Sequence, residues 1–503
     1  MDEDRESTGT AAEGGLAVTL DTPLVRLPAG TPTAVFCCGT CFHPSAEIRR
    51  LEVLVGGVAY EPTAFGMPRL DRYREVGDLR AYRSGFWATL PVHARERPGE
   101  IELRLRAALE DGRVVETPLG GIEVFEPDAP PAYAAAAAPR GAALIAVCMA
   151  TYDPDPELLR VQISSLREQS DRDWICLISD DASRPERFAE IDRAVDGDER
   201  FVISRSPVRR GFYRNFERAL EMVPADAPLV ALCDQDDRWY PDKLASLRRS
   251  IGDAQLVYSD QRLVTSDGRV LSETLWKGRR NNYANFASLV IANAIAGAAS
   301  LMRREVVEAA LPFPEGPGWQ FHDHWLAMVA MARGDLAYVD RPLYDYVHHA
   351  QGVVGKVSVE RSEGGGRRGR LAALRATFGG WRAAYFRAYV QLELQASVLE
   401  VRCAEELTPR KRRALRLLIA AGRSPLGLAW LALRPLRALI GRNETLGAEA
   451  LLARGLLWRH TLALRARARK RPKEGGGGLD TAIPPFDVDS FGQRRLKRWL
   501  ARS

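Results

Sequence analysis

Three aspartates directly follow an apolar stretch in the segment LVALCDQDDRW, residues 229–239. The apolar residues LVALC, some of them β-branched, are typical of a buried strand. Asp234, Asp236 and Asp237 then place three carboxylates within four positions. Neighbouring like charges raise one another's pKa, so this cluster at a strand end indicates a positive partner. Carboxylates suit Mg²⁺ or Mn²⁺, which proteins usually hold with one or two carboxylates together with substrate phosphates.

Two more polar motifs follow apolar stretches upstream. The stretch AALIAVCMATY (142–152) runs into DPD, and WICLISDD (174–181) runs into AS. Helical periodicity separates these stretches, for example in PELLRVQISSLREQ (156–169) and RPERFAEIDRAV (184–195). Strands that alternate with helices predict an α/β fold with a doubly wound, mostly parallel sheet. Ligands bind outside the carboxyl ends of such strands, where all three polar motifs fall.

The length of 503 residues is too great for one ordinary core and predicts two to four domains. The acidic start MDEDRESTGT does not resemble a signal peptide, and no apolar run approaches the ~20 residues of a membrane span. Seven scattered cysteines favour a reducing cytoplasm over a disulfide framework. Cys37, Cys38 and Cys41 fit a packed strand better than a zinc site, because no second CxxC partner exists.

Composition divides the chain into five predicted parts. We expect a disordered N-terminus over residues 1–15, a β-sandwich accessory domain of short strands over 16–126 and a Pro/Ala-rich linker over 127–142. The α/β catalytic domain then covers 143–355, and a basic helical region covers 356–503.

The basic region carries most of the chain's positive charge. Residues 356–503 contain 31 Lys and Arg against 12 Asp and Glu, a net charge of +19, whereas the whole chain has +6. Arginines lie beside apolar helical faces, which is consistent with a contact at the inner-membrane surface. The alternative is a helical domain with a solvated basic face. A nucleic-acid partner is not expected, because the region lacks interleaved aromatic residues and any recognised module.

The ordered motifs CMATYDP, ISDDAS, DQDDRW, NAIAGAASLMRR, FHDHW and HHAQGVVG resemble glycosyltransferase family 2 on a GT-A fold. The variant DQDDRW is most similar to bacterial rhamnosyltransferase-like members. The resemblance covers about residues 143–355. It implies a nucleoside-diphosphate sugar donor and Mg²⁺ or Mn²⁺ as cofactor, with Asp234 and Asp236 as the family's DXD motif.

The resemblance assigns residues to the nucleotide. Thr151 and Tyr152 match the first nucleotide-contacting positions, and Asp181 matches the acid that binds the imide N–H of the base. The segment RRGFYRNF matches a stretch that lines the nucleotide pocket; glycine there permits close backbone approach, and arginine can bind a phosphate. Its matching residues are Arg209, Arg210, Gly211 and Asn215.

The resemblance also assigns the metal site. Asp236 is expected to be a metal ligand, and Asp234 to lie nearer the ribose or sugar while also serving the metal; Asp237 is an alternative to either. His349 fits a Y-x-x-H-x-x-N pattern that can complete the site, although Gly352 replaces the asparagine. His348 is the alternative histidine.

Asp323 aligns with the family's catalytic base. It begins an apolar helix, whose dipole is expected to keep the carboxylate ionised, and a mere N-cap is the alternative role. His322 and His324 flank it and would contact the acceptor or cap the helix.

The implied reaction moves a sugar, with inversion, to a hydroxyl of a cell-surface glycan or lipid-linked saccharide. We expect a cytoplasmic protein that is peripheral at the inner face of the plasma membrane. The alternative function is a non-catalytic saccharide-binding or assembly protein on the same scaffold. A DxD hydrolase is disfavoured, because it would need a nucleophilic acid on the first strand, where this chain has CMATY.

Overall fold

The computed structural model describes residues 15–95, 97–127, 144–276, 280–316, 318, 320–348, 380–470, 472 and 481–482. Nearly all of the predicted N-terminal segment and linker, and both ends of the predicted basic region, lie outside the described residues. His349 lies outside them too.

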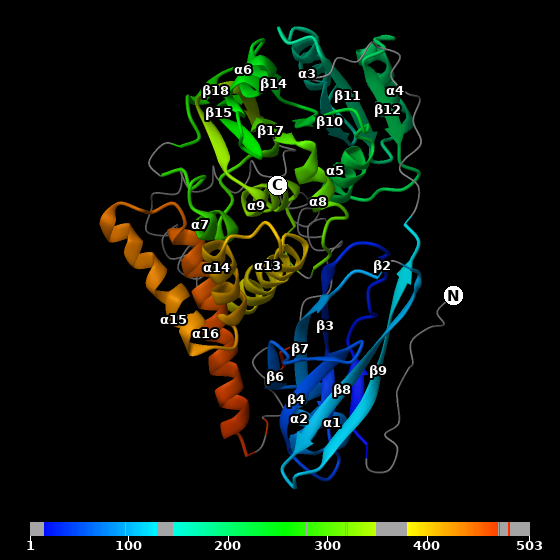
Figure 1. The fold of residues 1–503 in the computed structure, drawn as a ribbon, viewed down its shortest axis with the longest axis vertical. Helices are drawn as coiled ribbons and strands as arrows, with labels where there is room; N and C mark the ends of the chain where they lie inside the picture. Colours follow the sequence, from blue (N-terminus) through cyan, green and yellow to red (C-terminus); the bar gives the residue numbers. More distant parts are fainter. Residues whose placement is uncertain are drawn as a thin grey trace.

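The N-terminal strands form two sheets that pack face to face (Figure 1). The first has the order β1-β3-β7-β6 and the second β2-β9-β8-β4-β5. Burial alternates along β8, because every second side chain enters the core shared by the two sheets. The predicted β-sandwich is thus confirmed. The strands are β1 (Ala17–Leu20), β2 (Leu27–Pro28), β3 (Thr33–Phe42), β4 (Ile48–Val55), β5 (Val58–Tyr60), β6 (Ala64–Met67), β7 (Gly85–Val92), β8 (Gly99–Leu109) and β9 (Val114–Phe125), with α1 (Leu70–Val76) and α2 (Leu79–Tyr82) between β6 and β7.

A second unit is built on a mixed sheet with the order β12-β11-β10-β13-β17-β15-β18-β14, and β16 pairs with β15. The neighbours β12, β11, β10 and β13 are parallel, as are β15 and β18. β17 and β14 run antiparallel to their neighbours. The strands are β10 (Ile145–Thr151), β11 (Trp174–Asp180), β12 (Phe201–Arg205), β13 (Leu229–Asp234), β14 (Arg238–Trp239), β15 (Leu256–Thr265), β16 (Val270–Ser272), β17 (Ser300–Arg303) and β18 (Leu336–His348).

Helices follow the strands of this sheet and bury its faces, as the sequence predicts. α3 begins at Pro156 because the Asp155 side chain accepts the N–H groups of Glu157 and Leu158, at 3.0 and 3.3 Å. The helices are α3 (Pro156–Arg167), α4 (Pro185–Val195), α5 (Phe212–Glu221), α6 (Lys243–Ser250), α7 (Phe286–Ile291), η1 (Gly297–Ala299), α8 (Arg304–Ala310) and α9 (His322–Arg333). The predicted α/β class with a mostly parallel sheet is confirmed.

The C-terminal helices join the two units (Figure 1). α13 lies against β3 and β7 on one side and α9 on the other, and its side chains from Gln391 to Leu399 are buried. The Trp87 indole N–H donates to the Tyr385 hydroxyl at 3.0 Å. The helices are α12 (Trp381–Ala384), η2 (Tyr385–Val390), α13 (Gln391–Arg402), α14 (Pro409–Ala420), α15 (Pro425–Leu433), η3 (Arg434–Ile440) and α16 (Leu446–Ala468). The predicted helical region is thus confirmed.

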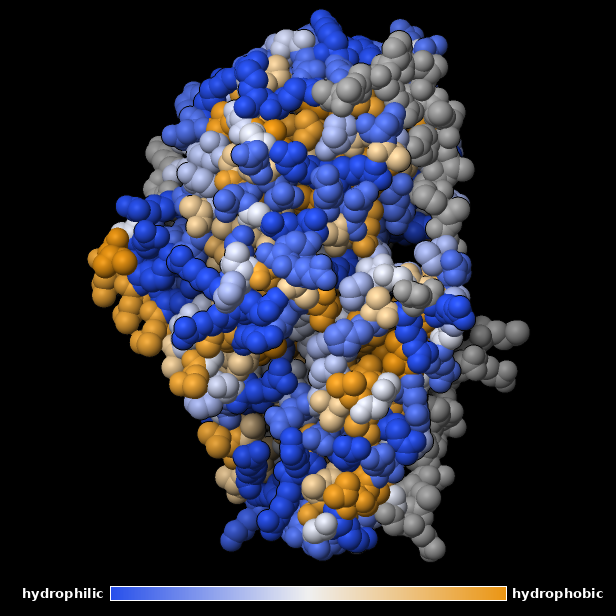
Figure 2. Space-filling view, viewed as in Figure 1, coloured by the Kyte–Doolittle hydropathy of each residue, from blue (hydrophilic) through white to orange (hydrophobic). Residues whose placement is uncertain are grey.

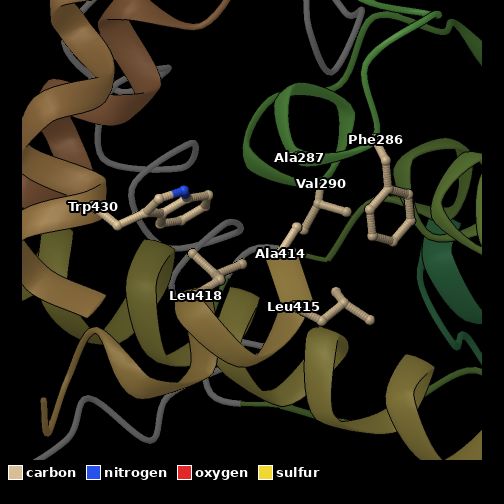
Figure 3. Close-up of a pocket in the computed structure, with 7 residues that line it drawn as sticks. All are labelled: Phe286, Ala287, Val290, Ala414, Leu415, Leu418 and Trp430. Carbon is tan, nitrogen blue, oxygen red and sulfur yellow. The ribbon is translucent and has the colours of Figure 1, made fainter. Parts of the chain in front are cut away.

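An apolar seam fastens α14 and α15 to α7 (Figure 3). Phe286 and Val290 of α7 face Leu415 and Leu418 of α14. Trp430 of α15 lines the same space. The space between these side chains is too small for a water molecule, so it is a packing seam rather than a ligand site. In the described ranges, no helix is both long and apolar enough to cross a bilayer.

Candidate active site

Strand register brings the three polar motifs to one edge of the central sheet. Thr151, at the end of β10, is paired with Asp180, at the end of β11. Ala150 is paired with Asp234, at the end of β13. Because these strands are parallel, the loops that follow them all leave from the same edge, as the sequence predicts.

The aspartates of DQDD are packed closely at this edge. Asp237 is 1% exposed; its Oδ1 accepts the Val347 N–H at 3.3 Å, and its Oδ2 has no hydrogen-bond partner. Burial, reinforced by the Asp234 and Asp236 charges, raises the pKa of Asp237 well above its usual value. Burial and the Asp236 and Asp323 charges raise the pKa of Asp234 to about 7. The positive charge near these carboxylates is therefore too small to keep them all ionised.

One buried cation lies beside this cluster. Lys243, at the start of α6, donates a hydrogen bond to the Ala298 carbonyl, and its Nζ lies 3.5 Å from the centroid of the Trp239 ring. Burial lowers the Lys243 pKa to about 7, although the nearby Asp237 and Asp234 charges oppose that shift. Among the described residues, Lys243 is the cation that lowers the pKa of Asp234 and Asp237, and one lysine does not offset their charges, so the donor set fits an additional cation.

Within the ranges that the structure describes, no three His, Cys, Asp or Glu side chains converge to enclose a metal ion. Mg²⁺ and Mn²⁺ sites that use one or two carboxylates and complete their shell with phosphate and water need no such enclosure. The unpartnered Oδ2 of Asp237 and the mutual repulsion of the aspartates agree with a site of that open kind.

We expect Lys243→Met to lower the Tm of the unfolding transition of this domain by roughly 6–20 °C. Removing one partner of a buried charge cluster costs about 3–5 kcal/mol, and 1 kcal/mol corresponds to about 2–4 °C in a domain of this size. Differential scanning calorimetry measures the shift, with Lys470→Met at an exposed position as the matched control. A Tm within 2 °C of the wild-type value would show that the acids do not depend on Lys243.

The first loop presents an aromatic ring and an arginine. Thr151 is buried, and its hydroxyl donates to Asp180 at 3.2 Å, so it links the ends of β10 and β11 at the base of the loop. Tyr152 is 36% exposed, and the Arg209 guanidinium lies 3.9 Å from its ring centroid. A flat ring beside an exposed cation can hold a base and a phosphate.

Gln235, which sequence reasoning did not single out, holds this loop to the acid cluster. Its side-chain carbonyl accepts the Tyr152 N–H at 2.8 Å, and its amide donates to the Tyr152 carbonyl at 3.2 Å. The only sequence signal is its place between two aspartates of DQDD.

Asp181 organises the glycine-containing loop that precedes α5. Its two carboxylate oxygens accept the N–H groups of Arg210, at 2.6 Å, and Gly211, at 2.8 Å. Gly211 has φ +86°, so a side chain there would be strained. The Asp181 carboxylate thus holds this loop through two backbone N–H groups, and its contact with the base stays a prediction. Arg210, within this loop, is exposed to solvent.

Asn215 lies in the interior beneath this edge, and its place in the nucleotide pocket stays a prediction. It is buried, its amide donates to the Thr151 carbonyl at 3.1 Å, and its Oδ1 accepts the Ser179 hydroxyl at 2.7 Å. It therefore ties α5 to β10 and β11. Of the residues predicted to touch the nucleotide, Tyr152, Arg209 and Arg210 are exposed at this edge.

Asp323 lies in the first turn of α9, where Phe321 is the N-cap residue. The Asp323 carboxylate accepts the His324 N–H at 2.6 Å, so it does not occupy the cap position. Burial raises its pKa to about 6, although hydrogen bonds from Gly297 and Asn293 oppose the rise. Burial opposes ionisation, but a pKa of about 6 still leaves Asp323 largely ionised at neutral pH, so the expectation that the helix dipole keeps it ionised stays a prediction. Its side chain still keeps partial solvent exposure.

The flanking histidines have different surroundings. His324 is tied to the Leu289 carbonyl through Nε2 at 2.8 Å. His322 stacks on Phe216 at 3.8 Å between ring centroids, and its Nδ1 has no partner. Gly297 is required beside it, because a Cβ there would lie 2.9 Å from His322 Nε2. Gly297 and Asn293 of NAIAGAAS were missed as site residues by sequence reasoning.

The end of β18 also reaches the acid cluster. The Val347 N–H binds Asp237, and His348 is paired in register with Thr265 of β15. His349 follows immediately but lies outside the described residues, so its predicted metal contact stays a prediction.

Comparison with known proteins identifies the α/β unit. Residues 146–311 match the family model described as glycosyl transferase family 2. An uncharacterized protein, y4gI, of Sinorhizobium fredii is 30% identical over 129 residues, which are 25% of this chain and 14% of that protein. The chain thus matches only about one seventh of that relative's length.

Two solved structures are similar at a low level. TarS of S. aureus, residues 1–349 in complex with UDP-GlcNAc, is 13% identical over 62% of this chain and 90% of that chain, with a TM-score of 0.37. The mannosyltransferase PcManGT of Pyrobaculum calidifontis, in complex with GDP-Man and Mn²⁺, is 17% identical over 63% and 86%, with a TM-score of 0.33. Likenesses this weak carry no conclusion about donor or metal. The family match, in contrast, is direct: residues 146–311, about a third of the chain, are similar to glycosyl transferase family 2.

Proposed function

We propose that the chain is a metal-dependent, inverting glycosyltransferase that moves a sugar, rhamnose or a related hexose, from a nucleoside diphosphate to a hydroxyl. One observation carries the proposal: the Asp323 carboxylate lies within electrostatic reach of Asp234 in the DQDD cluster, at the carboxyl edge of the sheet. A carboxylate that can accept the proton of an attacking hydroxyl lies beside an acid cluster that can hold the metal ion. This pair fits a reaction in which the hydroxyl attacks the sugar and the diphosphate leaves.

The donor would lie along the loops after β10 and β12. Tyr152 offers a face for the base, and Arg209 and Arg210 offer guanidinium groups for phosphate oxygens. Asp181 and Gln235 hold these loops in place through their backbone hydrogen bonds.

Asp234 and Asp236 would hold Mg²⁺ or Mn²⁺, with His349 as the predicted further ligand and Asp237 beside them. Bound there, the ion would supply positive charge that stabilises the departing diphosphate. The cation-poor cluster and the unpartnered Asp237 Oδ2 support this assignment.

Asp323 would accept the proton of the acceptor hydroxyl as that oxygen attacks the anomeric carbon. A carboxylate with a pKa near 6 is largely ionised at neutral pH and is a stronger base than an exposed aspartate. Gly297 and Asn293 orient it by hydrogen bonds. The resemblance to glycosyltransferase family 2 implies a single displacement with inversion at the anomeric carbon.

For the acceptor we propose a cell-surface glycan or a lipid-linked saccharide, in the cytoplasm at the inner face of the plasma membrane. The net charge of +19 in residues 356–503 supports this placement. Nucleic acid is not a proposed partner.

The proposal is tested by incubating the purified chain with a panel of sugar nucleotides, including dTDP-rhamnose, and with Mn²⁺, Mg²⁺ or EDTA. We expect metal-dependent release of the nucleoside diphosphate from one donor. If no donor is turned over, calorimetric titration with UDP, GDP and dTDP separates the cases. Metal-dependent nucleotide binding without turnover, even when candidate acceptors are present, would favour a non-catalytic scaffold, and no binding at all would contradict the nucleotide site.

A further inference from the structure

The outer face of α15 and η3 exposes a run of aliphatic side chains, named here the α15–η3 face. Leu439 is 83% exposed and Leu426 76%, far more than is usual for leucine. Leu426 and Leu433 are seven residues, about two turns, apart and so lie on the same side of α15, and Figure 2 shows apolar surface where Figure 1 places this helix. The face consists of Leu426, Leu433, Leu436, Leu439 and Ile440.

The α15–η3 face is held rigidly by contacts on its inner side. The Ser424 side chain caps α15 by accepting the Leu426 N–H at 3.2 Å, and Leu431 is fully buried. Arg434 forms a buried ion pair with Glu449 of α16 at 2.8 Å. The exposed leucines therefore belong to a packed helix, and no part of the described chain covers them.

Positive charge surrounds the same face. Between Thr408 and Asn443 the chain has nine Lys and Arg residues and no Asp or Glu. Arg423 and Arg442, on either side of the face, are exposed, and so is Arg413 of α14. An apolar strip with basic flanks is complementary to the acyl chains and acidic headgroups of an anionic bilayer.

Other occupants fit less well. A second copy docked through the same face would bring two basic flanks together, which like-charge repulsion disfavours. Single-stranded nucleic acid is usually bound by stacking on aromatic side chains, whereas this face is aliphatic.

We infer that the α15–η3 face is a docking surface for an anionic lipid bilayer, into whose interface its leucines insert while the flanking arginines contact acidic headgroups. This surface is independent of the proposed transferase activity, because it shares no residue with the site around Asp234 and Asp323.

The test is flotation of the full chain with vesicles of phosphatidylcholine alone and of phosphatidylcholine with 30% phosphatidylglycerol. We expect the chain to float with the anionic vesicles only. The triple variant Leu433→Ser, Leu439→Ser, Ile440→Ser is expected to bind them at least ~10-fold more weakly. The matched control replaces Val58, Val114 and Val270, which are exposed on strands elsewhere, with serine and is expected to bind normally.

Circular dichroism and Tm measurements are expected to show that both triple variants are folded. Equal flotation of the wild type and the leucine variant, or no flotation of the wild type with anionic vesicles, would overturn the inference. A wild-type dimer in analytical ultracentrifugation that this variant abolishes would instead assign the face to a second copy of the chain.

Discussion

Asp323→Asn is expected to lower kcat by about 10²–10⁴-fold with the donor identified by the sugar-nucleotide screen. The amide keeps the size and hydrogen-bonding shape of the side chain but cannot accept the acceptor's proton, and general-base catalysis contributes about that factor. Binding of the donor nucleotide should change less than threefold, since Asp323 is assigned to the acceptor side. Steady-state kinetics and calorimetric titration measure the two effects.

The matched control is Asp253→Asn, an exposed aspartate before β15, at the opposite edge of the sheet. It should leave kcat unchanged. Because burial disfavours the charged form of Asp323, its replacement by asparagine should not lower the Tm. A kcat within threefold of the wild-type value would remove Asp323 from the reaction, and a loss of kcat accompanied by a lower Tm would assign it a structural role.

Much of the site's placement follows from local sequence signals. An apolar strand that ends in DQDD, together with two earlier strands that end in polar motifs, is enough to predict that Thr151, Asp180 and Asp234 meet at one edge. Parallel register then follows from the helices between the strands, because a right-handed crossover returns the chain in the same direction.

The direction of β17 and the position of the C-terminal helices could not be predicted in this way. β17 has only four residues between two short helical segments, and such a run does not indicate its pairing direction. The sequence of α13 mixes polar and apolar residues, yet the helix is buried because β3, β7 and α9 pack against it. Contacts between segments hundreds of residues apart, such as Trp87 with Tyr385, leave no local periodicity to detect.

Individual side-chain roles were the least predictable part of the site. Asp181 and Asn215 carry the residue types of a ligand-binding loop, but in this structure they bind backbone groups and, for Asn215, also the Ser179 hydroxyl. A resemblance gives a residue type at a position and does not say which of several hydrogen-bond donors lies within 3 Å. Gln235, Asn293 and Gly297 were missed for the same reason, since their importance arises only from what they contact.

Asp236→Asn is expected to weaken Mn²⁺ binding at least ~10-fold and turnover at least ~100-fold. The substitution removes one carboxylate from the acid cluster, and divalent ions of this class depend on anionic oxygen ligands. The Tm should stay the same or rise, because the Asp236 charge raises the pKa of both Asp234 and Asp237 and so strains the cluster. Electron paramagnetic resonance titration of free Mn²⁺ gives the affinity without relying on activity.

The control variant is Asp335→Asn, an exposed aspartate before β18, which should bind Mn²⁺ as the wild type does. Nucleoside diphosphate titrations with and without Mn²⁺ add a second measurement. In the wild type the ion should strengthen nucleotide binding, and in Asp236→Asn that gain should disappear while metal-free binding is unchanged or tighter, because less negative charge faces the phosphates. If Mn²⁺ strengthens nucleotide binding equally in both proteins, the ion does not depend on Asp236, and Asp234 or Asp237 must hold it.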